Sequence, residues 1–97
     1  MRKDGTMKQI KTEWCENWIK ARFAKLPSFA DGIYSGLFWK EAEKSGLYAK
    51  GTYDTPMSEA LSNLCCVVDV VDENGYTQYS CFKLKGSKIR ENERLLA

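Results

Sequence analysis

The sequence contains no histidine, the side chain that most often serves as a general base and as a metal ligand. Its absence excludes the Ser–His and Cys–His pairs that activate a nucleophile. The chain also lacks a G-x-G-x-x-G segment or any other glycine-rich phosphate-binding loop. We therefore expect a protein that is not an enzyme and that carries no cofactor.

Cysteine pairs of the zinc-binding type are absent as well. The four cysteines are Cys15, Cys65, Cys66 and Cys81, and no two of them form a C-x-x-C pair. Adjacent residues of a strand point to opposite faces, so Cys65 and Cys66 do not readily reach one ion, and no metal site is expected. Cys66 and Cys81 can lie opposite each other on a hairpin. A reversible disulfide is one interpretation of that pair, and buried small apolar side chains are the interpretation favoured for a cytoplasmic chain.

No apolar run approaches the length of a membrane span, and the segment from Met1 to Met7 has no apolar stretch behind it. The expectation is a cytoplasmic protein without a secretory signal. A length of 97 residues suits one domain. We expect a flexible leader over residues 1–6, a single domain over 7–85 and a charged tail over 86–97. The tail is expected to be either disordered or a short helix, and Met7 is an alternative start.

Apolar spacing predicts a first helix from about Met7 to Leu26. Trp14 and Trp18 share its wide apolar face and are expected in the core. Pro27 stops this helix, because proline has no backbone N–H to donate.

A second helix is predicted from about Tyr34 to Ser45, closed by Gly46 in the usual C-terminal position. Trp39 is expected to point away from the inward face of this helix, toward a second contact. The residues expected to face inward are Leu37, Phe38 and Ala42.

The third predicted helix begins at Thr55 as its cap, with Pro56 in the first turn, and continues to Leu64. It runs almost directly into an apolar strand, Cys65–Val71.

A tight hairpin is predicted from that strand onward. Asn74 and Gly75 supply residues that tolerate positive φ in the turn, and residues 76–85 return the chain. One face is expected to hold Cys65, Val67, Val71, Phe82 and Leu84, and the opposite face Cys66, Val68, Val70, Tyr79 and Cys81. Both faces are substantially apolar, so we expect one to pack on the helices and the other to form an interface.

The run from Leu37 to Leu84 resembles the winged helix-turn-helix superfamily. The matching pieces are the end of the second helix at Ala42–Leu47, the third helix at Met57–Leu64 and the closing strand at Tyr79–Leu84. The resemblance implies an α+β fold, a small winged-helix-like domain of three helices followed by a C-terminal β-hairpin.

In that superfamily the third helix enters the major groove of DNA and the wing touches the backbone. Carried over to this chain, the resemblance implies base contacts from Ser58, Ser62 and Asn63, phosphate contacts from Lys50 and Tyr53, and a wing contact from Asn74 or Tyr76. This sequence departs from the pattern, because its third helix has no Lys or Arg and carries Glu59. DNA binding would then depend on basic residues of the first helix, such as Lys20 and Lys25, or on the tail.

Two functions therefore remain open. One is a nucleic-acid-binding regulator or accessory factor that binds double-stranded DNA. The other is a protein-binding module or inhibitor, of the kind that phages and mobile elements encode against host defence nucleases. The residues expected at that alternative protein interface are Trp39, Val68, Val70 and Tyr79. A homodimer formed through the outer hairpin face is a third interpretation, and no membrane partner is expected.

Overall fold

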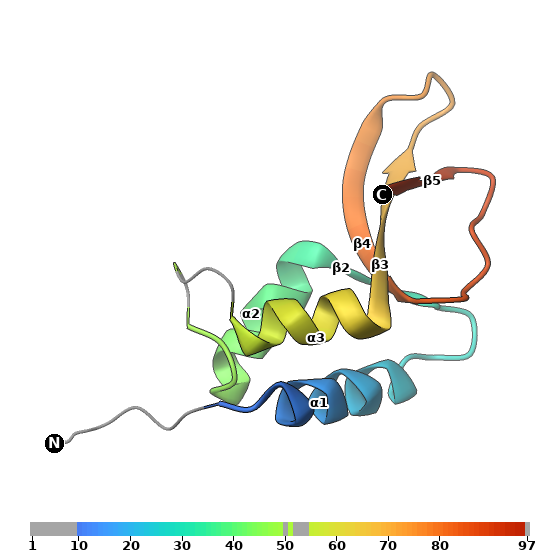
Figure 1. Cartoon of the computed structure of the whole chain (residues 1–97). Coiled ribbons are helices and arrows are strands. Elements are labelled where there is room, and N and C mark those ends of the chain that lie inside the picture. Colours follow the sequence, from blue (N-terminus) through green and yellow to red (C-terminus); the bar gives the residue numbers. More distant parts are fainter. Residues whose placement is uncertain (1–9, 50, 52–54, 97) are drawn as a thin grey trace, which may run out of the picture.

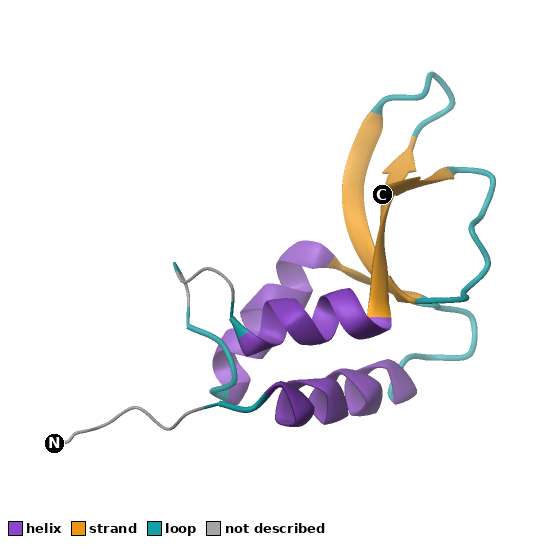
Figure 2. Ribbon diagram, in the orientation of Figure 1, coloured by secondary structure: helices purple, strands orange, loops and turns teal. Residues whose placement is uncertain are grey.

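The computed structural model describes residues 10–49, 51 and 55–96 and confirms a small α+β domain. The elements are α1 (Thr12–Ala24), β2 (Gly32–Tyr34), α2 (Ser35–Ser45), α3 (Pro56–Leu64), β3 (Cys65–Val71), β4 (Thr77–Leu84) and β5 (Glu93–Leu96). The three helices gather at one end, and the β3–β4 hairpin rises away from them (Figure 1). The ribbon coloured by secondary structure shows this separation of a helical base from a β-sheet (Figure 2). The expected leader over residues 1–6 lies outside the described residues.

Each helix has a local reason for its position. In α1 the buried side chains of Cys15, Ile19 and Phe23 recur every four residues and face the core. α2 ends at Gly46, whose φ of 82° is a conformation that glycine adopts without strain. α3 begins where the Thr55 hydroxyl accepts a hydrogen bond from the Ser58 backbone N–H at 3.1 Å.

Two expectations about the apolar faces were wrong. Trp14 is 42% exposed, and the Lys11 ammonium lies 5.8 Å from the centroid of its ring. Leu37 is 43% exposed, because the inward face of α2 is occupied by Phe38 and Ala42, which are both fully buried. The spacing of apolar residues indicates a broad apolar stripe on each helix. Which side chains of the stripe become buried is decided by packing against α3 and the sheet, which the spacing does not show.

The strands form one antiparallel sheet in the order β2-β4-β3-β5, so the predicted hairpin lies in its centre. β2 was not predicted, because three residues are too few to show a period. It pairs Ile33 with Phe82 and joins the chain between α1 and α2 to the hairpin. The expectation of disorder or a short helix beyond residue 86 was wrong, since β5 pairs with β3.

The hairpin register confirms the predicted distribution of side chains over the two faces. Val67 is paired with Phe82 on the helix side, and Val70 is paired with Tyr79 on the other side. The register shifts by one residue between Val70 and Val71. At the turn, one carboxylate oxygen of Asp72 accepts hydrogen bonds from the backbone N–H groups two and four residues later, each at 2.9 Å. This side chain adds to the backbone bond of the turn, in which the Asp72 carbonyl accepts from the Gly75 N–H at 3.0 Å.

The main core lies between the helices and the inner face of the sheet, around Phe38. Its ring contacts Trp18, Trp39 and Phe82 edge-on, with ring centroids 5.4, 5.4 and 5.0 Å away. Such edge-to-face pairs are a favourable arrangement of aromatic rings. The same rings that stabilise the core therefore also fix the wall of the groove described next.

Candidate functional site

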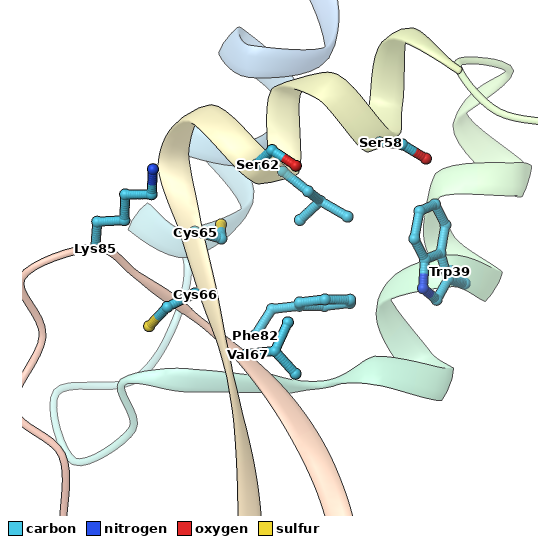
Figure 3. Close-up of a pocket in the computed structure, with 9 residues that line it drawn as sticks. Trp39, Ser58, Ser62, Cys65, Cys66, Val67, Phe82 and Lys85 are labelled. Atoms are coloured by element: carbon cyan, nitrogen blue, oxygen red, sulfur yellow. The ribbon is translucent and has the colours of Figure 1, made fainter. Parts of the chain in front are cut away.

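An open groove of about 470 Å³ lies between α2, α3 and the base of the hairpin. It is lined by Trp39, Ser58, Leu61, Ser62, Cys65, Cys66, Val67, Phe82 and Lys85. Figure 3 shows Ser58 and Ser62 along α3 on one side, Trp39 on α2 across from Lys85, and Phe82 beneath. The groove thus combines an apolar floor with two hydroxyl groups and one cation.

Trp39 forms a wall that is held on three sides. Its ring lies edge-on to Phe38 and to Phe82, with the Phe82 centroid 6.1 Å away, and it tilts against Tyr48 at 4.6 Å. An aromatic side chain fixed in this way offers apolar contact area without losing much conformational freedom on binding. The expectation that Trp39 points away from the inward face of α2 was wrong, because its ring packs against the core residues Phe38 and Phe82.

Lys85 is the single charged residue among those that line this groove. Its backbone N–H donates to the Leu64 carbonyl at 2.9 Å, which ties the end of β4 to the end of α3. Its side chain is exposed and has no acidic partner in the part of the chain that the structure describes. The groove therefore presents an uncompensated positive charge at the end opposite Trp39.

The predicted base-contacting residues of α3 do not share one surface. Ser58 and Ser62 line the groove, but Asn63 turns toward α1 and donates to the Glu16 carboxylate at 2.9 Å. Glu59 lies on the same side as Asn63 and accepts a hydrogen bond from the Thr12 hydroxyl at 2.6 Å. The side of α3 that carries Asn63 is therefore engaged with α1.

The remaining predicted DNA-binding residues lie in other places. Lys20 is exposed on α1 and Lys25 at the C-terminal cap of that helix, and Lys20 borders a separate hollow beside the hairpin base. Asn74 and Tyr76 are exposed at the hairpin tip, far along the hairpin from the helices (Figure 1). Lys50 and Tyr53 fall outside the described residues. Of the nine predicted positions, Ser58 and Ser62 are brought together, and they line both the groove and a smaller hollow beside Thr55 and Glu59.

The hairpin tip carries acidic side chains that the sequence pattern did not place together. A hollow there is lined by Val71, Asp72, Glu73, Glu91 and Asn92. Glu91 reaches this place because the C-terminal segment returns alongside β3, and the Asn92 carbonyl accepts from the Val71 N–H at 2.8 Å. A tip of this charge repels the phosphates that a wing would contact.

The predicted protein interface is divided in the same way. Trp39 lies in the groove, Val68 is fully buried, and Val70 and Tyr79 lie on the opposite face of the sheet. Tyr79 is 46% exposed and meets Tyr34 edge-on at 5.9 Å. Sequence reasoning missed Tyr34 because β2, which carries it, was not predicted.

Three of the four cysteines, Cys15, Cys65 and Cys81, lack the features of reactive thiols. Burial raises the pKa of Cys65 to about 11, with the neighbouring Cys66 adding to the shift and Lys85 opposing it. Burial also raises the pKa values of Cys15 and Cys81. These three thiols are protonated at neutral pH, and the protonated form is a poor nucleophile.

The hairpin register does not place Cys66 opposite Cys81. Cys66 is paired with Lys83 and Cys81 with Val68, so the two cysteines are diagonal neighbours. Diagonal positions lie about 7–8 Å apart, beyond the usual reach of a disulfide. Both are free thiols in this structure. Cys15 and Cys65 are buried as small apolar side chains would be, whereas Cys66 and Cys81 are only partly buried.

None of the helices described in the structure is long and apolar enough to cross a membrane. No protein-family model, curated protein or solved structure matches this chain. The functional conclusion therefore depends on the geometry and charge of the surfaces described above.

Proposed function

We propose that this protein is a non-catalytic protein-binding module and that the groove between α2, α3 and the hairpin is its binding site. The observation that carries the proposal is the fixed aromatic side chain of Trp39, which borders an open groove together with Leu61, Phe82 and the exposed Ser62. Aromatic side chains in the centre of a hollow, with polar groups at its edge, are typical of residues that dominate protein interfaces.

The distribution of charge supports a protein partner over nucleic acid. The described residues carry equal numbers of acidic and basic side chains. Basic groups that pair with acidic ones include Arg22 with Glu41 and Arg94 with Asp69. Phosphate neutralisation supplies most non-specific affinity for DNA, and a neutral surface with an acidic hairpin tip offers little of it.

Ser62→Arg is expected to abolish the selection of binding peptides from a phage-displayed random library, because the long side chain blocks the groove. The wild-type protein is expected to enrich a family of related peptides. Affinity for the strongest of them, measured by titration calorimetry, is expected to fall by about tenfold or more in the variant.

Asn63→Arg is the matched control, since it adds the same side chain at the next residue of α3 but on the side that faces α1. It is expected to retain peptide binding. Circular dichroism confirms that both variants are folded. An equal loss in the two variants, or no loss in Ser62→Arg, would show that the groove is not the binding site.

The second candidate is a winged-helix nucleic-acid-binding regulator. It is supported by the order of three helices and a hairpin and by Lys20 and Lys25, which are exposed on α1 and at its C-terminal cap without an acidic partner among the described residues. If this function is real, random duplex DNA binds at low salt and Lys20→Glu with Lys25→Glu abolishes binding, as measured by fluorescence anisotropy. Absence of binding at low salt removes this candidate.

A further inference from the structure

The groove offers more than an apolar contact, because its two ends differ in chemistry. Trp39 closes one end with an apolar ring, and Lys85 stands at the other with an uncompensated ammonium group (Figure 3). Building on the function proposed above, we propose that the natural occupant is a peptide segment that places an apolar side chain against Trp39 and an Asp or Glu beside Lys85.

The apolar half of this proposal follows from the floor of the groove. Leu61 and Phe82 are nearly buried, at 7% exposed each, and present only carbon atoms of their side chains to the space that Trp39 borders. An apolar side chain that enters this space is removed from water at about 25 cal/mol per Å² of buried apolar area. A nucleic-acid backbone has no group of this kind to offer.

The acidic half follows from charge complementarity. The lining residues of the groove include Lys85 and no Asp or Glu. Two acidic side chains of α1 and α3 accept hydrogen bonds within the chain, Glu16 from Asn63 and Glu59 from Thr12. A carboxylate on the partner would therefore meet an ammonium group for which no acidic residue of the groove lining competes, and like charges on a basic partner would be repelled.

The hydroxyl groups between the two ends suit a peptide backbone. The Ser62 hydroxyl is exposed and has no hydrogen-bond partner in the described part of the chain, whereas the Ser58 hydroxyl lies 3.1 Å from that of Thr55. Both line the α3 side of the groove. A hydroxyl group can donate to a carbonyl or accept from an N–H, which is what a peptide that runs along this wall would need.

Lys85→Glu tests the proposal by reversing the one charge. A random phage-displayed peptide library is selected in parallel on the wild-type protein, on Lys85→Glu and on Lys40→Glu, a control that makes the same charge change at an exposed position of α2 that does not line the groove. We expect the wild type and Lys40→Glu to enrich peptides that combine apolar residues with Asp or Glu. We expect Lys85→Glu to select Lys or Arg at that place and to bind the best acidic peptide about tenfold more weakly.

The outcomes separate this proposal from the function on which it depends. The proposed occupant is overturned if the enriched peptides show no preference for acidic residues, or if Lys85→Glu leaves such a preference unchanged. In either case the protein-binding function stands if Ser62→Arg still blocks binding. Failure of the wild type to enrich any peptide overturns both. Salt-dependent binding of duplex DNA that Lys85→Glu abolishes and Lys40→Glu preserves would identify the anion as phosphate and would also overturn the peptide.

Discussion

Lys83→Ala is expected to lower the free energy of unfolding by about 3–5 kcal/mol. Lys83 is fully buried, and its ammonium group donates to Glu93 Oε1 at 2.6 Å and to the Lys88 carbonyl at 2.8 Å. Asp31 Oδ2 lies 3.3 Å away. Removal of the ammonium leaves the nearly buried Glu93 carboxylate without its counter-charge, which is the main cost. Urea denaturation followed by circular dichroism measures the change.

Two further variants show whether the buried charge is responsible. Adding Glu93→Gln to Lys83→Ala is expected to recover part of the loss, because the uncompensated carboxylate is then absent. Lys88→Ala removes an exposed lysine side chain but retains the carbonyl that Lys83 uses, and is expected to change stability by no more than about 0.5 kcal/mol. A cost below about 1 kcal/mol for Lys83→Ala would mean that the buried ion pair is not holding β5 to the sheet.

Phe38→Ala is expected to cost about 3–5 kcal/mol, the usual range for a buried phenylalanine. Phe38 is fully buried, and its ring contacts Trp18, Trp39 and Phe82. Its removal leaves a cavity that rigid aromatic neighbours cannot easily fill, so we expect the cost toward the upper part of this range. The midpoint and slope of urea denaturation measure the effect.

Leu37→Ala is the matched control for Phe38→Ala, because it shortens the preceding residue of the same helix, where 43% of the side chain is exposed. It is expected to cost less than about 1 kcal/mol. Equal effects of the two changes would contradict the packing around Phe38. Since Phe38 also supports Trp39 and Phe82, a loosened core is expected to weaken peptide binding as well.

The parts of the fold that could be predicted are those whose signals are local. Thr55 and Pro56 mark the start of α3, Gly46 the end of α2, and Gly75 the hairpin turn. β2 and β5 could not be predicted, because short edge strands are specified by pairing with β4 and β3. β5 is also held by the ion pair between its Glu93 and the buried Lys83 of β4, and nothing in the sequence indicates that this lysine is buried.

The candidate site could be predicted only in fragments. Trp39 and Ser62 were singled out for different functions, and the structure places them in one groove. Lys85 was not singled out, because its importance depends on the absence of acidic residues that are near in space and not in sequence. The absence of Lys and Arg from the third helix indicated little positive charge there, but the acidic hollow at the hairpin tip also depends on the return of Glu91, which the sequence pattern did not indicate.

The central place of β4 in the sheet has a consequence for the order of folding. β2 precedes α2, α3 and the hairpin in the sequence, so Ile33 pairs with Phe82, a residue that is synthesised long after it. Bringing Ile33 and Phe82 together closes a long loop of the chain. The entropic cost of this closure arises before the contact can stabilise the fold, and it slows folding. During synthesis, α1 and α2 would leave the ribosome before β4. Phe38 could therefore not contact Phe82 until β4 emerges. A nascent chain stalled before residue 77 would therefore expose the apolar face that the finished domain conceals, and chaperones bind surfaces of that kind.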